Sequence, residues 1–264
     1  MSAGFEELAS VDGRISATAE AVVPLKDDGI YRGDGAFEVI RLYAGRPFAL
    51  SDHVDRLGRS AAAIELGFDR PALEAEVAAL LERAGPVEGQ LRLIVTRGGR
   101  RIAATEPIPA HAETVTVATV TYSTTIILEG VKSLSYAANM QATRIAKSRG
   151  ADEAVLVRPD GTVLEPPTSS IFWASPDGAL RTSALSDGVL ESITRDRLVK
   201  ALDVEEGTWS VEDLRGAGEA FLASTTREIQ AVSAIDGTEL PDAPGPRTRE
   251  AQEAFAATLE RELR

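Results

Sequence analysis

Lys132 has the clearest chemical potential in this 264-residue chain, because lysine is rare in it. Only four of the 28 basic residues are lysines, and the other 24 are arginines. A guanidinium binds phosphates and carboxylates but stays protonated, whereas a lysine amine can act as a nucleophile. The apolar neighbours Val131 and Leu134 are compatible with a lowered pKa of that amine. Taken alone, a lysine at a strand end is usually a solvated surface residue, so the surrounding pattern decides.

Composition removes several other kinds of chemistry. The chain has two histidines, His53 and His111, and no cysteine, so a histidine-built metal site, thiolate chemistry and disulfides are not expected. A net charge of −13 disfavours a nucleic-acid partner, because no basic stripe is available to contact phosphates. Catalysis is therefore expected to depend on lysine, carboxylates or a bound cofactor, with no metal.

No apolar stretch approaches the ~18 residues that a membrane span requires. The first seven residues, MSAGFEE, do not have the basic segment and apolar run of a signal peptide. We therefore expect a cytoplasmic protein that acts on small molecules and does not contact a membrane.

The elements that would position these residues can be read from periodicity and turn signals. Asp12-Gly13 predicts a hairpin, and Ser51 is expected to cap a helix. After Lys132 we expect a helix at 136–149 that ends at Gly150, and then strands at 153–157, 162–165 and 219–223. A C-terminal helix is expected near 248–263. The pattern predicts an α/β protein with a small α+β domain at 1–118, a linker at 119–129 and a larger domain at 130–264.

The succession from Lys132 through GADEAVLV (150–157) to DGTVLE (160–165) closely resembles the fold-type IV pyridoxal-phosphate (PLP) enzymes. This family includes branched-chain and D-amino-acid aminotransferases and aminodeoxychorismate lyase. The resemblance covers almost the whole chain, as far as PGPRT at 244–248. It implies a D-amino-acid aminotransferase-like fold, PLP as cofactor in the larger domain, a homodimer, and Lys132 as the Schiff-base lysine.

Glu165 falls where the family has a carboxylate facing the ring nitrogen of PLP, which keeps that nitrogen protonated. The loop that follows departs from the family: PPTSS at 166–170 replaces Gly-Ser/Ala-x-Ser-Asn. The two prolines remove two backbone donors. Ser169 is the candidate cofactor contact in this loop.

Three segments far apart in sequence resemble the family's phosphate anchors: DHVDRL at 52–57, SITR at 192–195 and ASTTREI at 223–229. A bidentate guanidinium and a helix N-terminus are both suited to a phosphate dianion. The resemblance makes the following residues candidate cofactor contacts: Arg56, Ile193, Thr194, Ser224 and Thr225.

Tyr136 matches the tyrosine that hydrogen-bonds the 3′ oxygen of the cofactor in branched-chain enzymes, and it could equally be a buried core aromatic. Phe37 and Val39, in the run YRGDGAFE and the residue after it, are expected to line the substrate pocket. Arginines near that pocket are candidates for binding a substrate carboxylate. The candidates are Arg32, Arg92 and Arg100.

The resemblance predicts an aminotransferase that moves an amino group between an amino acid or amine and a 2-oxo acid by a ping-pong mechanism. Two alternatives stay open. One is an aminodeoxychorismate lyase, which eliminates pyruvate to give 4-aminobenzoate; SYAAN after Lys132 and the RGGR turn at 97–100 allow it. The other is a non-catalytic binding protein on the same fold, which the Pro166-Pro167 departure makes conceivable.

Overall fold

A computed structural model gives the structure of the protein, and it describes residues 6–264. Two compact units make up the chain. Of the described residues, unit 1 contains 6–109 and 131–136, and unit 2 contains 110–130 and 137–262. The chain therefore leaves unit 1, returns to it for six residues around Lys132, and leaves it again.

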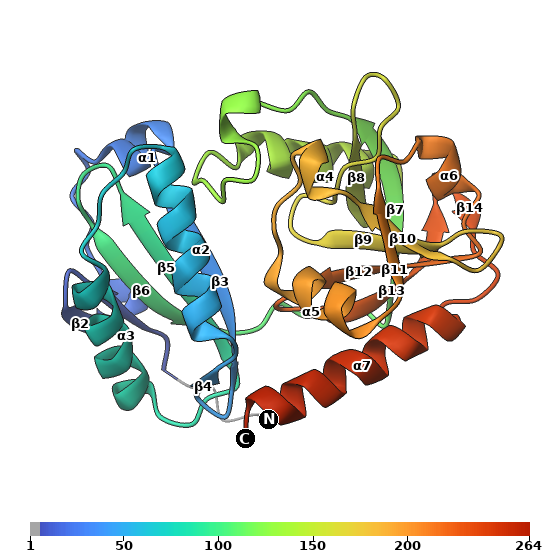
Figure 1. Ribbon diagram of the computed structural model, residues 1–264. Helices are drawn as coiled ribbons and strands as arrows, with labels where there is room; N and C mark the ends of the chain where they lie inside the picture. The colour runs from blue at the N-terminus through green and yellow to red at the C-terminus, as the bar shows by residue number, and fades with distance from the viewer. Residues whose placement is uncertain (1–5) are drawn as a thin grey trace. The chain divides into compact units, whose positions relative to one another are not determined.

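Unit 1 is a six-stranded sheet in the order β2-β1-β6-β5-β3-β4, in which the neighbouring strands are antiparallel. Its elements are β1 (Leu8–Val11), β2 (Arg14–Ala17), η1 (Thr18–Glu20), α1 (Asp28–Arg32), β3 (Gly35–Tyr43), β4 (Arg46–Pro47), α2 (Leu50–Ala63), α3 (Arg70–Ala84), β5 (Gly89–Thr96) and β6 (Arg101–Glu106). Helices α2 and α3 pack on one face of this sheet (Figure 1), where Leu57, Leu73 and Leu91 are fully buried.

The predicted hairpin in unit 1 is confirmed, because β1 and β2 pair around Asp12 and Gly13, both with positive φ. The predicted cap of α2 is wrong. The helix begins at Leu50, its N-cap is Ala49 at φ 52°, and no side chain caps it. The β3–β4 hairpin delivers the chain into α2 through this left-handed residue, so Ser51 lies inside the first turn.

Unit 2 is an eight-stranded mixed sheet whose path runs β11-β10-β9-β12-β13-β7-β8, with β14 paired to β13. Its elements are β7 (Thr114–Thr121), η2 (Ile126–Leu128), α4 (Ala137–Ser148), β8 (Glu153–Val157), β9 (Ser170–Ala174), β10 (Leu180–Ser183), η3 (Leu185–Asp187), α5 (Ile193–Ala201), β11 (Val204–Gly207), α6 (Val211–Arg215), β12 (Glu219–Ser224), β13 (Glu228–Ile235), β14 (Thr238–Glu239) and α7 (Pro246–Glu262).

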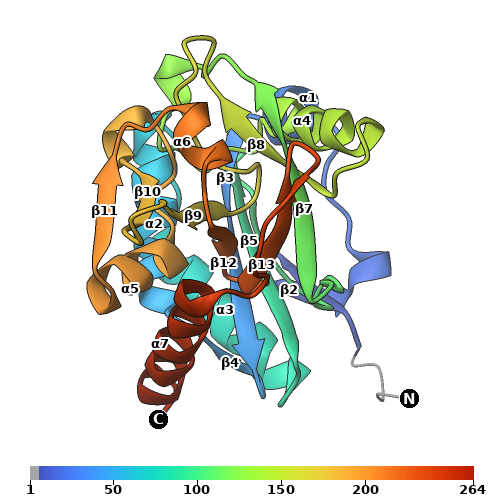
Figure 2. The same cartoon turned by 90° about the vertical axis from the view of Figure 1, so that its right-hand side faces the viewer.

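Helix α4 packs on β7 and β8, and helices α5 and α7 pack on β12 and on each other (Figure 2). Every residue of β8, β9 and β12 is buried, as expected for strands covered on both faces. The predicted helix before Gly150 is confirmed: it spans Ala137–Ser148, and Gly150 follows at φ +84°. Within residues 6–264, no helix combines the length and the apolar character that crossing a membrane requires.

Two sequence expectations differ from the structure of unit 2. Residues 162–165 do not form a strand: Thr162 and Val163 make single bridges only. Glu165 still accepts a hydrogen bond from the backbone of Leu156, but Pro166 and Pro167 have no N–H with which to continue the ladder. The expected linker at 119–129 overlaps the end of β7, a strand that pairs on both sides within the sheet.

Candidate active site

The backbone around Lys132 is fixed within unit 1. Its N–H donates to Oγ of Ser60 on α2 at 3.1 Å, and its carbonyl accepts the N–H of Phe37 at 3.0 Å. Two residues further on, the N–H of Leu134 donates to the carbonyl of Gly35 at 2.8 Å. The segment at 131–136 therefore runs along the start of β3, and these bonds explain why it belongs to unit 1.

The amine of Lys132 lies against two aromatic rings. Its Nζ is 4.5 Å from the ring centroid of Phe37 and 5.9 Å from that of Tyr136. The two rings meet edge to face, with centroids 5.2 Å apart and an interplanar angle of 86°. Three predicted site residues thus form one cluster in unit 1, and Val39 lies two residues along β3 from Phe37, on the same face of the strand.

Arg56 belongs to a buried polar cluster that contains two residues not among the predicted ones. Its Nε and Nη2 donate to the two carboxylate oxygens of Glu38 at 2.7 and 2.6 Å. Nδ1 of His53 lies 2.8 Å from Oε2 of the same carboxylate. Glu38 and His53 are fully buried, and Arg56 is almost so. The predicted phosphate arginine is therefore held in a fixed plane by a carboxylate on β3.

The charges within this cluster follow from its burial. Burial by itself would raise the pKa of Glu38, but the charge and hydrogen bonds of Arg56 outweigh it and lower the pKa to about 2. Burial lowers the pKa of His53 below 6.5, with further lowering by the positive charges of Arg56 and Lys132. Neutral His53 donates its Nδ1–H to Glu38, and Nε2 is buried without a hydrogen-bond partner in the described part of the chain.

A sequence signal for Glu38 did exist. Residues 36, 38, 40 and 42 share one face of β3, and the other three are the buried Ala36, Ile40 and Leu42. A carboxylate on a core-facing strand position requires a buried cationic partner, because an unpaired buried charge is very costly. His53 and Arg56 lie three residues apart on α2, so the same helix face could supply that partner.

In unit 2, Glu165 is connected to the start of α5. Its Oε1 accepts the N–H of Leu190 at 2.7 Å. Helix α5 then begins after Ser192, whose side chain accepts the N–H of Arg195. Ile193 and Thr194 are buried in the first turn, where backbone N–H groups have no acceptor within the helix. The structure thus brings the predicted ring carboxylate and one predicted phosphate segment together.

The sheet of unit 2 brings two further candidates into register. Strands β9 and β12 are antiparallel, with Ser170 opposite Ala223. Continuing this register by one residue sets Ser169 beside Ser224, at the point where β12 turns into Thr225. The hydroxyl of Ser169 is buried and has no hydrogen-bond partner among the residues described. An oxygen of this kind fits a site that binds a ligand.

Each candidate substrate arginine is paired with a carboxylate inside unit 1. Arg92 donates from Nε and Nη2 to the two oxygens of Glu106 at 2.6 and 2.8 Å. Arg32, at the end of α1, is 3.4 Å from Asp28, and its side chain is 74% exposed. Of these two, Arg32 has the looser pair and the greater freedom to meet a substrate.

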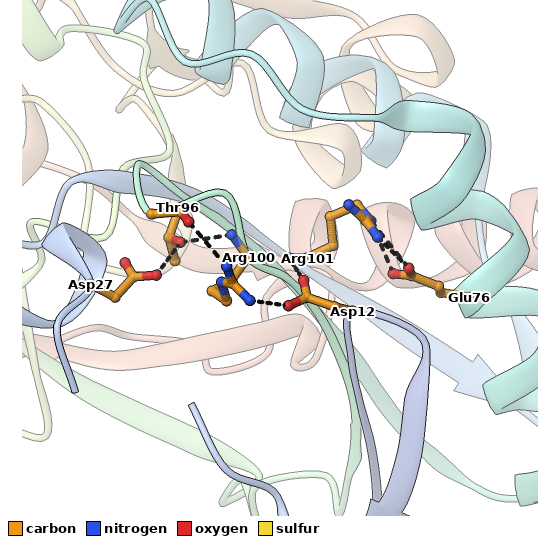
Figure 3. Close-up of polar contacts among 7 residues, drawn as sticks. Asp12, Asp27, Glu76, Thr96, Arg100 and Arg101 are labelled. Atoms are coloured by element: carbon orange, nitrogen blue, oxygen red, sulfur yellow. Dashed lines mark hydrogen bonds and ion pairs between the residues drawn. The ribbon is translucent and has the colours of Figure 1, made fainter. Parts of the chain in front are cut away.

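Arg100 is part of the network drawn in Figure 3. Its Nη1 donates to Asp12 at 2.5 Å, and its backbone N–H donates to the hydroxyl of Thr96 at 3.2 Å. That hydroxyl in turn donates to the buried Asp27 at 2.8 Å. The network fixes the turn between β5 and β6, so Arg100 would have to give up Asp12 before it could bind a substrate carboxylate.

Comparison with known proteins gives a consistent result. A family model described as amino-transferase class IV matches residues 35–235. A D-alanine aminotransferase from Bacillus licheniformis is 32% identical, over 94% of this chain and 95% of the relative. A putative branched-chain-amino-acid aminotransferase from Methanocaldococcus jannaschii is 31% identical, over 86% of this chain and 87% of the relative.

Solved structures agree in fold. A hypothetical aminotransferase from Mycobacterium tuberculosis in its PLP-bound form is 28% identical and superposes with a TM-score of 0.85. The match covers 95% of this chain and 98% of that protein. A second structure with the same description is in an alpha-ketoglutarate and PMP bound form, with a TM-score of 0.86.

Proposed function

Because this chain belongs to the class IV aminotransferases, PLP-dependent enzymes of fold type IV, we propose that Lys132 carries the cofactor and transfers the proton during catalysis. The observation that supports this role is the fixed position of Lys132, whose backbone is held by Ser60 and Phe37 while its amine lies against two rings. Once joined to the amino nitrogen of the substrate in place of Nζ, PLP would supply an electron sink for the α-carbon of the substrate.

The donor set fits this cofactor. A phosphate accepts hydrogen bonds, and the candidates in unit 2 offer the unpartnered buried hydroxyl of Ser169, the hydroxyls of Thr194, Ser224 and Thr225, and the amide of Ile193 at a helix N-terminus. Glu165 supplies the anion that keeps a ring nitrogen protonated. Arg56 remains a candidate phosphate contact, but its Nε and Nη2 already donate to Glu38, so it would meet the phosphate only through hydrogens that Glu38 does not take.

The residues of the chain then have distinct tasks. With an amino donor and the cofactor bound, Nζ of Lys132 would take the proton from the α-carbon of the substrate and deliver it to C4′ of the cofactor, the carbon on the other side of the amino nitrogen. The rings of Phe37 and Tyr136 limit the access of water to Nζ. We assign the 3′ oxygen of the cofactor to Tyr136 and one wall of the substrate pocket to Phe37 and Val39.

Amino acids and 2-oxo acids are the substrate class. We propose that Arg32 binds the substrate carboxylate first, because its ion pair with Asp28 is long and exposed. Arg92 and Arg100 contribute only with substrates that displace Glu106 or Asp12. A donor panel of D-alanine, L-leucine and their enantiomers with 2-oxoglutarate as acceptor would identify the hand and the class of the donor.

Borohydride reduction followed by peptide mapping tests the role of Lys132 without measuring turnover. We expect the label on the peptide that contains Lys132. Lys132→Ala should lose both the label and amino transfer, with a rate at least about 10³-fold lower. The matched control is Lys147→Ala on the exposed face of α4, which should keep both. A label on another lysine would contradict the assignment.

The lyase alternative is not favoured, because the named relatives are aminotransferases. The same protein preparation distinguishes the two reactions directly. Transfer of nitrogen to 2-oxoglutarate supports the proposal, and release of pyruvate from aminodeoxychorismate without such transfer contradicts it.

We also propose that the enzyme is a cytoplasmic homodimer. Unit 1 exposes apolar side chains that a second copy could cover: Val22, Leu25, Ile30 and Tyr31, each at least half exposed. Light scattering of the purified protein would test the dimer, and cell fractionation would test the compartment.

A further inference from the structure

Arg227 is a nearly buried arginine in the turn between β12 and β13, two residues after Thr225. Its side chain is 9% exposed. Nη2 donates to Oε2 of Glu153 at 2.8 Å, and it also lies 3.4 Å from the hydroxyl of Thr168. Nη1 donates to Oε1 of Gln230 at 2.9 Å. One guanidinium thus joins the β12–β13 turn to the beginning of β8 and to the loop after Glu165.

The loop at 166–169 depends on such a contact more than an ordinary loop does. Pro166 and Pro167 have no N–H, so neither residue can donate a backbone hydrogen bond that would hold it. The carbonyl of Pro167 accepts a hydrogen bond of 3.4 Å from Nδ2 of Asn139. The contact from Arg227 to Thr168 therefore helps to hold the loop just before Ser169.

Extending the β9–β12 register by one residue beyond Ser170 and Ala223 sets Ser169 beside Ser224, and Arg227 contacts the chain on both sides of this pair. On one side it contacts Thr168, the residue before Ser169. On the other side its own backbone N–H lies 3.4 Å from the hydroxyl of Ser224. A shift of either segment would separate the hydroxyls that are proposed to bind the phosphate.

Arg227 is suited to positioning and not to binding the phosphate through its charge. Glu153 neutralises it, and the other oxygen of Glu153 accepts a hydrogen bond from Thr143 on α4 at 3.0 Å. Nε of Arg227 is buried with no acceptor within residues 6–264. In this part of the chain the guanidinium therefore makes its contacts through Nη1 and Nη2 alone.

We propose that Arg227 is a positioning residue that locks the Pro166–Ser169 loop against the β12–β13 turn, so that the hydroxyls of Ser169, Ser224 and Thr225 converge on the phosphate of the cofactor. This inference rests on the proposed function. It gives the departure at Pro166-Pro167 a consequence: the two prolines remove two backbone donors from this loop, and a distant arginine supplies a donor to it at Thr168.

The test compares Arg227→Met with Arg215→Met, a matched loss of an ion-paired arginine on the surface of the same unit. For Arg227→Met we expect the dissociation constant of PLP from the apoenzyme to rise about tenfold, the lower end of the roughly 10–100-fold loss of affinity seen when an outer partner is removed at a metal site. The turnover rate at saturating PLP should stay within about twofold, since no reacting atom is touched. Arg215→Met should leave the PLP dissociation constant unchanged.

An unchanged PLP dissociation constant in Arg227→Met, whether or not the apoenzyme loses stability, would overturn the inference. If Arg227→Met does not fold, Thr168→Val provides the test. This variant removes the hydroxyl that Arg227 contacts in the loop and keeps the ion pair between Arg227 and Glu153. Its PLP dissociation constant should rise, by a smaller factor, and no change overturns the inference. Failure of the proposed function can be told apart from failure of this inference, because in the former case borohydride would trap no adduct at Lys132 of the wild-type protein.

Discussion

Replacing Glu38 with Gln would remove the negative charge from a site that still holds a buried guanidinium. In the native protein the carboxylate accepts two hydrogen bonds from Arg56, at 2.7 and 2.6 Å, and has none of its surface exposed. Glutamine has nearly the same shape but offers one acceptor oxygen and an amide that faces a cationic donor. Arg56 would then lose its bidentate carboxylate partner in the interior of unit 1.

Two independent estimates give the loss in the free energy of unfolding that Glu38→Gln should cause. The pKa of Glu38 falls from an ordinary 4.5 to about 2, and at about 1.4 kcal/mol for each pKa unit the ionised form contributes roughly 3 kcal/mol. Breaking one side of a buried ion pair generally costs about 3–5 kcal/mol. Both estimates predict that Glu38→Gln lowers the free energy of unfolding by roughly 3 kcal/mol at neutral pH.

The direction of the pH dependence follows from the depressed pKa. The folded protein binds a proton at Glu38 less readily than the unfolded chain does, so this stabilisation is complete above about pH 4.5 and disappears as the pH falls toward 2. The wild-type protein should therefore lose stability more steeply than Glu38→Gln below pH 5.

Urea unfolding of the apoprotein, followed between pH 7 and pH 3, measures both effects. The control is Glu74→Gln, which removes a carboxylate paired with Nε of Arg70 at 2.8 Å on the surface of α3, with both side chains more than 40% exposed. That change should cost less than about 1 kcal/mol. The reasoning would be refuted if the two variants lost the same free energy of unfolding at pH 7. It would also be refuted if the free energy of unfolding fell equally steeply with pH below 5 in the wild type and in Glu38→Gln.

Two further predictions concern His53 and Ser169. Because burial keeps the pKa of His53 below 6.5, the wild type should lose stability as the pH falls below 6.5, and His53→Asn should lose less between pH 6.5 and 5.5 in urea titrations. Coincident curves for the two proteins would contradict that expectation. Ser169→Ala removes a buried hydroxyl without a partner among the described residues, so the apoenzyme should be as stable or up to about 1 kcal/mol more stable, while the PLP dissociation constant rises. Loss of stability together with unchanged PLP binding would exclude Ser169 as a cofactor contact.

The features that could be predicted from the sequence are those set by residues adjacent along the chain. The hairpin at Asp12-Gly13 and the end of α4 before Gly150 were predicted because backbone conformation there is set by one or two residues. The fold and the aminotransferase activity were predicted from short motifs around Lys132, and the comparisons confirm both. Where a local rule failed, as with the cap of α2, the path of the preceding hairpin overrode it.

Other features required the tertiary structure, because they join residues that the chain separates widely. Nothing near Arg92 in the sequence indicates that Glu106 occupies its guanidinium, since that pair depends on the register of β5 and β6. The contact of Arg227 with Glu153 likewise spans 74 positions. The residue types of this chain determined which groups could react or bind, whereas strand register and helix packing determined which charges are already paired, because electrostatic energy depends on distance in space and not on distance along the chain.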